Sequence, residues 1–407
     1  MAEFQPKTAE QLWRLSFEGA WPTSVAFLGS NRIAAGNRDG QILIWDLTQE
    51  PRAAVKQAKS PKTKPQPGET AADVEPLRQL QGHSNGIARL VTTPDGQRLI
   101  SASLDHSLRI WDVDAPSSGE TQVVIDRKSR EKQAKRLPQA ERQAFIDAPG
   151  VTVETLTASS VLNGHKDWVN ALGISRDGKR LISGDARSKV IVWEITGGQP
   201  VSSWTGHGWN GIVAAGLSPD GQSAVVSEFT YKRDDFDLPA PALKVWNVDD
   251  ASEKLDILKT HIPKLDVTKT SYGAASVWRK FVKGGLIALD LSPDGTLLAA
   301  GQGGETDKGQ LHLFDVETGK LVRTMSGHRY GMCDAKFSAD GQYVLTSGRD
   351  TTVRICQVSD GKEVNVLGKE RGGQFKDWLH GLAISADQTR VAAADIGGAV
   401  HVWEFSG

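Results

Sequence analysis

Three residues whose chemistry would suit a hydrolase, His83, Ser101 and Asp105, lie within one short stretch of the chain. A histidine that bridges a serine hydroxyl and a carboxylate can activate the serine as a nucleophile. The same side chains, followed by Trp111, can instead form a buried hydrogen-bonded network, because buried imidazole and indole N–H groups need acceptors. The choice between a catalytic and a structural set depends on whether the pattern recurs.

The pattern recurs, with variations, along the whole chain. An aromatic residue or its replacement closes each copy, at Trp45, Trp111, Trp193, Trp246, Phe314, Cys356 and Trp403. Turns of the Pro-Asp-Gly type stand at 93–96, 175–178, 218–221, 292–295 and 338–341, and a decayed form stands at 385–388. In the copy around His83, turn residues separate three alternating runs, which predicts strands at Ile87–Thr92, Arg98–Ser103 and Ser107–Val113.

These marks resemble those of the WD-repeat family, and the uniform turns are similar to those of its bacterial members. The resemblance implies an all-β fold, a seven-bladed β-propeller of four-stranded antiparallel blades. The last copy stops after its third strand, at Val400–Phe405. We therefore expect the N-terminal segment Gln11–Phe17 to complete the last blade and close the ring.

The resemblance also implies that the His, Ser, Asp and Trp side chains form structural networks inside the blades. The members are His83, Ser101, Asp105 and Trp111 in the second copy, His165, Ser183 and Trp193 in the third, His207 and Trp246 in the fourth, and His328, Ser347 and Asp350 in the sixth. In the third copy Arg187 stands where an aspartate is expected, and in the sixth Cys356 supplies no indole donor. Because the set is built copy by copy with a Trp attached, we interpret it as structural rather than catalytic.

Composition and motifs place further limits on function. The net charge of −1 gives no global field to attract nucleic acid or a membrane. No apolar run approaches the ~18–20 residues of a membrane span, and the polar N-terminus does not resemble a signal peptide. The two cysteines, Cys333 and Cys356, fall in strands separated by a third, which argues against a disulfide and favours a cytoplasmic protein. No metal or cofactor motif and no nucleophile elbow is present, so we expect no enzyme activity, no cofactor and no metal.

We expect residues 1–407 to form a single propeller with three insertions. Residues 48–75 are rich in Pro, Lys, Gln and Ala, which predicts a flexible insertion. Residues 115–158 form a charged insertion with a helix expected after Pro138, which either docks a partner or is simply solvated. Residues 262–284 form a third insertion in a loop of the face that carries the entry loops.

The resemblance places the loops that enter each blade on one face of the ring, the top face. Aromatic residues occupy six of these loops: Trp21, Trp168, Trp209, Trp278, Tyr330 and Trp378. Basic residues accompany them, among them Arg279, Lys280 and Arg371. Aromatic and Arg side chains are enriched in binding hot spots, whereas a Trp shortly after a Gly-His pair can equally pack between blades.

The leading functional hypothesis is a non-catalytic scaffold that binds a protein or peptide through the top face. One alternative is nucleic-acid or anionic-ligand binding through the basic aromatic loops, since bases stack on such side chains. The other alternative is a propeller enzyme or small-ligand binder that uses the central channel. The sequence leaves the partner's identity and the oligomeric state open.

Overall fold

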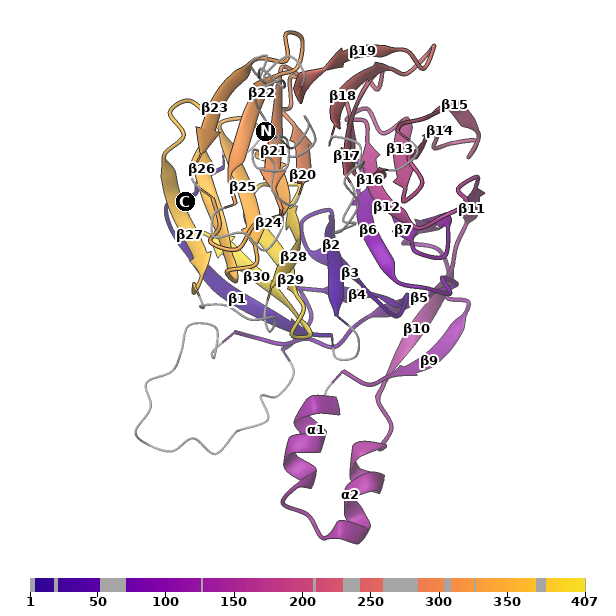
Figure 1. The fold of residues 1–407 in the computed structure, drawn as a ribbon. Helices are drawn as coiled ribbons and strands as arrows, with labels where there is room; N and C mark the ends of the chain where they lie inside the picture. The colour runs from indigo at the N-terminus through magenta and orange to yellow at the C-terminus, as the bar shows by residue number, and fades with distance from the viewer. Residues whose placement is uncertain are drawn as a thin grey trace, which may run out of the picture.

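In the computed structural model, the chain is a closed ring of seven β-sheet blades around a central axis (Figure 1). The structure describes residues 4–17, 21–51, 71–125, 127–207, 210–229, 242–258, 285–303, 309–325, 327–370 and 378–406. The predicted fold class, a seven-bladed propeller of antiparallel blades, is confirmed.

Each blade consists of four strands that run from the central axis outward, and we call the innermost one its first strand. Blade one holds β2 (Pro22–Leu28), β3 (Arg32–Asn37), β4 (Ile42–Asp46) and β5 (Arg78–Gln81); blade two holds β6 (Ile87–Thr92), β7 (Arg98–Ser103), β8 (Ser107–Asp112) and β11 (Ser160–Asn163). Blade three holds β12 (Val169–Ile174), β13 (Arg180–Asp185), β14 (Lys189–Glu194) and β15 (Pro200–Thr205); blade four holds β16 (Gly211–Leu217), β17 (Ser223–Phe229), β18 (Ala242–Asn247) and β19 (Glu253–Asp256).

The remaining three blades follow the same plan. Blade five holds β20 (Leu286–Leu291), β21 (Leu297–Gln302), β22 (Leu311–Asp315) and β23 (Leu321–Met325); blade six holds β24 (Met332–Phe337), β25 (Tyr343–Gly348), β26 (Thr352–Gln357) and β27 (Glu363–Gly368). Blade seven holds β28 (Leu379–Ile384), β29 (Arg390–Asp395), β30 (Ala399–Phe405) and, as its outer strand, β1 (Ala9–Ser16).

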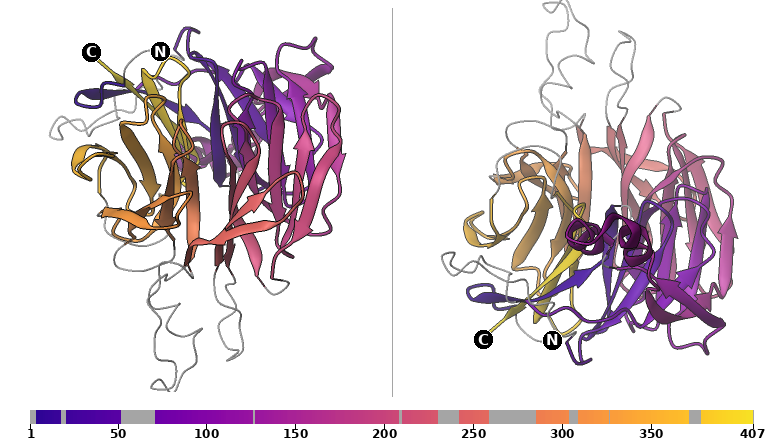
Figure 2. Two further views of the ribbon diagram at one scale, coloured as in Figure 1. Left: turned by 90° about the horizontal axis from the view of Figure 1, so that it is seen from above. Right: turned by 90° about the horizontal axis from the view of Figure 1, so that it is seen from below.

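The N-terminal strand closes the ring, as predicted. β1 pairs antiparallel with β30, from Ala9 opposite Phe405 to Ser16 opposite Ala399, and the two strands lie side by side in Figure 2. Leu15 at the end of β1 is fully buried in the core between blades seven and one. Hydrogen bonds and apolar contacts from the two ends of the chain thus complete one blade.

The hydrophobic core is divided among the seven interfaces between neighbouring blades. Each buried cluster takes side chains from two adjacent blades, such as Ile42 and Trp111 between blades one and two or Ile182 and Trp246 between blades three and four. Among the described residues, none of these clusters lies within a single blade. Burial of apolar surface therefore depends on the intact ring.

Two insertions depart from the regular plan. The long insertion after β8 adds β9 (Gly119–Val123) and β10 (Val151–Thr157) to the outer edge of blade one, where β10 pairs parallel with β5. Between these strands, helices α1 (Arg127–Ala134) and α2 (Gln139–Ile146) form a hairpin that projects away from the blades (Figure 1). α2 is the helix expected after Pro138, whereas the two added strands were not foreseen.

The end of the first insertion is held against the closing strand. The backbone N–H of Arg14 donates a 2.8 Å hydrogen bond to the carbonyl of Ala72, and the Ser16 hydroxyl donates a 2.7 Å hydrogen bond to Asp73. The side chain of Val74 is fully buried. Residues 71–75, which we expected to belong to the flexible insertion, thus pack on β1. Residues 52–70 of that insertion and all of 262–284 lie outside the described residues.

Candidate functional site

The His-Ser-Asp-Trp set of blade two forms a connected buried network. His83 lies between Asp105, at 2.7 Å from Nδ1, and Ser101, at 2.7 Å from Nε2, while the Trp111 indole donates to the same Ser101 hydroxyl at 2.9 Å. Burial alone would raise the pKa of Asp105, but hydrogen bonds from His83 and Ser107 hold it well below its usual range. The serine oxygen is occupied by two partners inside the blade, which is the geometry of a structural network.

Blade three contains the same network with its acid in a different place. His165 contacts Asp185 at 2.9 Å and Ser183 at 2.7 Å, and the Trp193 indole donates to Ser183 at 2.8 Å. Arg187 does stand at the position equivalent to Asp105, but the network does not lack an acid, because Asp185, the last residue of β13, supplies it. Arg187 instead forms an exposed 2.8 Å ion pair with Asp167.

In blade six the hydroxyl partner is Thr346, not Ser347. His328 contacts Asp350 at 2.8 Å and the Thr346 hydroxyl at 2.9 Å. In blade six Val344 pairs with Cys356, and Thr346 follows two residues later. In blade two Leu99 pairs with Trp111, and Ser101 follows two residues later, so Thr346 and Ser101 occupy equivalent positions. Since a shift of one residue moves a side chain to the other face of a strand, Ser347 points away from the imidazole and its buried hydroxyl has no hydrogen-bond partner.

Blade four does not form the network that His207 and Trp246 were expected to share. The His207 side chain is exposed, and its backbone N–H donates to Glu228 at 2.8 Å. The Trp246 indole N–H is buried without a hydrogen-bond partner and stacks on Trp204, with ring centroids 5.2 Å apart. The cause is Val226, which occupies the register position of Ser101 and offers no acceptor.

The entry loops and the turns between the second and third strands share the top face, because every blade begins its first strand there. Three tryptophans occupy the same position, just before β2, β12 and β28. Each carbonyl accepts a hydrogen bond from the turn of its own blade: Trp21 from Arg38 at 3.0 Å, Trp168 from Ala186 at 2.9 Å and Trp378 from Ile396 at 3.0 Å. Trp21 is 46% exposed and Trp168 is 51% exposed. The backbone is fixed while the indoles of Trp21 and Trp168 remain accessible.

Arginine side chains stack on the aromatic residues of blades six, seven and one. The guanidinium carbon lies 5.0 Å from the ring centroid for Arg38 on Trp21, 5.2 Å for Arg329 on Tyr330 and 4.3 Å for Arg349 on Trp378. We call these six residues the aromatic arc, since the three blades are consecutive around the closed ring. Guanidinium stacking attracts the cation to the ring face and leaves the edge donors available for hydrogen bonds.

Below the arc, at the upper mouth of the channel, lie an imidazole and a thiol. His380 stacks beside Trp378 with ring centroids 6.2 Å apart, and burial together with Arg89, Arg349 and Arg38 lowers its pKa to about 4. Burial raises the pKa of the Cys333 thiol to about 11. At neutral pH both groups are therefore uncharged, and the charged groups beside them include Arg38, Arg89 and Arg349.

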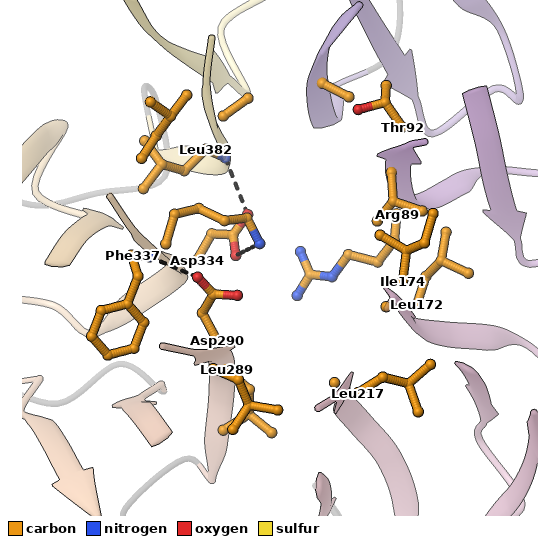
Figure 3. A pocket seen from close by; sticks show the side chains of 18 of the residues that line it. Arg89, Thr92, Leu172, Ile174, Leu217, Leu289, Asp290, Asp334, Phe337 and Leu382 are labelled. Carbon is orange, nitrogen blue, oxygen red and sulfur yellow. Dashed lines mark hydrogen bonds and ion pairs between the residues drawn. The ribbon is translucent and has the colours of Figure 1, made fainter. Parts of the chain in front are cut away.

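The first strands of all seven blades line a central cavity of about 430 Å³ (Figure 3). Its wall combines apolar and polar side chains, and Arg89 faces Asp290 and Asp334 across it. Asp334 lies 3.5 Å from the Lys336 ammonium and also accepts the backbone N–H of Leu382 at 3.2 Å. Burial, with a smaller contribution from Asp334, raises the pKa of Asp290 to about 6 against the opposing effect of Lys336.

Sequence reasoning did not single out these channel charges, although a signal was present. Arg89 interrupts the apolar run that was predicted to be the strand Ile87–Thr92, and Asp290 and Lys336 interrupt similar short apolar runs. A charge at a position that a ring must enclose is costly unless it is paired or serves a ligand. Of the predicted top-face residues, Trp209, Trp278, Arg279, Lys280 and Arg371 lie outside the described residues.

Among the described residues, no group of three or more His, Cys, Asp or Glu side chains could hold a metal ion. No helix in the described ranges is long and apolar enough to cross a membrane.

Three segments of the chain match the family model of the WD domain, G-beta repeat: residues 74–112, 156–194 and 319–356. These segments contain the blades whose His-acid-hydroxyl networks are complete, around His83, His165 and His328. The chain therefore carries WD40 repeats in three places. The blades that the model does not match are those in which Ala or Val replaces the hydroxyl residue, such as Val226.

Similar proteins include WD-repeat proteins of several kinds. The chain is 26% identical to autophagy-related protein 16 of Arabidopsis thaliana over 237 residues, which are 58% of this chain and 39% of that protein. It is 22% identical to a guanine nucleotide-binding protein subunit beta of the same plant over 354 residues, which are 83% and 85% of the two chains. It is 35% identical to WD repeat and SOCS box-containing protein 1 of Danio rerio over 114 residues, 28% of this chain and 25% of that protein. The chain spans about two fifths of the first of these relatives.

Proposed function

We propose that this protein is a non-catalytic scaffold that binds a protein or peptide partner through the top face, with the aromatic arc as the principal contact. The observation that carries the proposal is the stacking of Arg38, Arg329 and Arg349 on the aromatic residues of three consecutive blades. Trp, Tyr and Arg are the residue types that dominate binding hot spots. The relatives support the coarse function, since one is by name a subunit of a larger protein and others are named for WD repeats.

The arc suits a partner surface that carries carboxylates beside apolar or aromatic groups. The guanidinium groups have N–H donors in the fork geometry that matches a carboxylate. Part of this charge is already balanced, because Glu370 lies 3.9 Å from Arg329 and 3.6 Å from Arg354. A partner acid would therefore bind best over Arg38 and Arg349, which form no ion pair with any other described residue.

Affinity purification from the native host tests this proposal with matched variants. The double variant Trp21→Ala, Trp378→Ala removes two indoles of the arc, and we expect proteins retained by the wild type to be lost. Trp168→Ala is the control, because it removes an equally exposed indole at the same position on blade three, outside the arc. Retention of every partner by the double variant, with unchanged folding, would contradict the proposal.

The nucleic-acid alternative rests on the same arginine-aromatic stacks, because bases stack on aromatic and guanidinium planes. It predicts that a fluorescent single-stranded oligonucleotide binds and that binding weakens steeply as salt increases. A protein partner held by a few stacked contacts predicts no oligonucleotide binding at physiological salt. The oligonucleotide titration therefore separates the two candidates directly.

A further inference from the structure

Two arginine side chains cross the central channel, one at each end of the cavity. From blade two, Arg89 reaches the carbonyl of Ile287 on blade five at 3.5 Å. From the turn below β12 on blade three, Arg176 reaches the carbonyl of Ala339 on blade six at 3.4 Å. The cavity of about 430 Å³ lies between these crossings. Its volume falls within the ~300–1,000 Å³ typical of small-molecule sites.

The walls between the two crossings combine apolar side chains with polar and charged groups. The apolar part of the lining comes from different blades and includes Leu172, Ile174, Leu217, Leu289 and Leu382 (Figure 3). Small-ligand sites combine such apolar walls with a few convergent polar groups that fix orientation. The charged groups here are those of Arg89, Asp290, Asp334 and Lys336, together with Arg176 at one end of the cavity.

The four charges are unequally satisfied. Asp334 is engaged by Lys336 at 3.5 Å and by two backbone N–H groups, from Ala335 at 2.9 Å and Leu382 at 3.2 Å. Asp290 accepts the N–H of Phe337 at 2.6 Å through Oδ2, and its carboxyl faces the cavity (Figure 3). A carboxylate has about four acceptor positions, so capacity for a ligand remains.

Arg89, whose side chain extends across the channel from blade two, is the matching donor. Its hydrogen bond to Ile287 engages one of the five N–H donors that a guanidinium carries. Among the described residues no ion pair joins Arg89 to Asp290 or Asp334, although the groups face each other across the cavity. The space between Arg89 and Asp290 thus has an anion-binding wall and a cation-binding wall.

We propose that the central cavity binds a small zwitterionic ligand of the amino-acid or dipeptide class, with its carboxylate on Arg89 and its ammonium group on Asp290. An anion alone would be repelled by Asp290, and a cation alone would be repelled by Arg89. A zwitterion satisfies both walls, and an apolar side chain fills the remaining volume against the leucines. This site is separate from the aromatic arc and does not depend on the proposed scaffold function.

Isothermal titration calorimetry of the full chain with L-leucine, L-phenylalanine and the dipeptide Leu-Leu tests the proposal. We expect saturable binding of at least one of them and none of N-acetyl-leucinamide, which has the same apolar body without either charge. Arg89→Gln and Asp290→Asn should each weaken binding by about tenfold or more, since each removes one charge-assisted contact. Arg38→Gln removes an arginine of the arc instead and should leave the affinity unchanged.

A cavity-filling variant keeps the proposal testable if the charge variants fail to fold. Ile174→Trp keeps every channel charge but occupies the apolar volume, so it should abolish binding while circular dichroism stays that of the wild type. The proposal is overturned if none of the three zwitterions binds at millimolar concentration. It is equally overturned if the capped compound binds as well as leucine, or if folded Arg89→Gln or Ile174→Trp protein binds normally. The absence of ligand binding in these titrations would not contradict the proposed binding of a partner at the aromatic arc.

Discussion

A pair of buried serines offers a quantitative test of how the blades are held together. Ser101 and Ser347 are both fully buried in the second strand of their blades, and both were expected to join a His-Asp network. In the structure Ser101 bonds to His83 and Trp111, whereas the Ser347 hydroxyl has no partner. Replacing each with alanine therefore removes a buried hydroxyl oxygen, which is hydrogen-bonded at position 101 and has no hydrogen-bond partner at position 347.

The magnitudes follow from the hydrogen bonds that are lost. Ser101→Ala leaves the Nε2 of His83 and the indole N–H of Trp111 buried without their shared oxygen, which should cost about 2–4 kcal/mol of unfolding free energy. Ser347→Ala removes a desolvated hydroxyl that makes no hydrogen bond, so it should be neutral or stabilising by up to about 1 kcal/mol.

Urea denaturation followed by tryptophan fluorescence measures both changes. If the ring of 407 residues unfolds as one unit, an unfolding entropy of ~2.1 cal/mol/K per residue gives ~0.85 kcal/mol/K, so Ser101→Ala should lower Tm by about 2–5 °C. Equal destabilisation by the two variants would refute the register argument. A neutral Ser101→Ala would refute the claim that the network stabilises the blade.

Three further predictions concern the ring, the acid of blade three and pH. Deleting residues 1–17 removes β1 and the buried Leu15, so thermal unfolding should begin at a lower temperature, and an unchanged Tm would show that closure by β1 does not stabilise the ring. Asp185→Asn should destabilise the protein by about 2 kcal/mol because it weakens the contact with buried His165. Arg187→Ala breaks only an exposed ion pair and should change the free energy of unfolding by less than ~0.5 kcal/mol. Comparable urea midpoints for the two variants would contradict the assignment of Asp185 as the acid of the network. Folding lowers the pKa of His380 from 6.5 to about 4, so between these pH values the unfolded chain binds one more proton than the folded chain. The free energy of unfolding should therefore be highest above pH 6.5 and should decrease by up to about 3 kcal/mol as the pH falls toward 4. His380→Gln should flatten this part of the stability profile, and an unchanged slope would assign the effect to other groups.

The repeat pattern predicted the blades closely because each strand is bounded by local turn chemistry. β6 and β7 begin and end at the predicted residues, and β8 ends one residue early. The closing strand was predicted from the missing fourth strand of the last copy, since an open edge in a ring is unfavourable. The pairing of β10 with β5 could not be read in the same way, because it joins an insertion to a blade far away in the sequence.

The networks show where local reading fails. Ser347 and Thr346 are adjacent and both carry hydroxyls, so only the pairing with β26 decides which one faces His328. Asp185 was overlooked because it ends the strand rather than standing in the turn. The channel charges required the ring itself, since Arg89 and Ile287 meet across its centre.

Hydroxyl-radical footprinting of the complex isolated from the native host tests the central claim, partner binding at the aromatic arc, most directly. Trp21 and Trp168 have similar exposure in the free chain, 46% and 51%, and occupy the same position on different blades. The proposal predicts that the partner protects Trp21 from oxidation and leaves Trp168 reactive. Equal oxidation of Trp21 in the free protein and in the complex would contradict it.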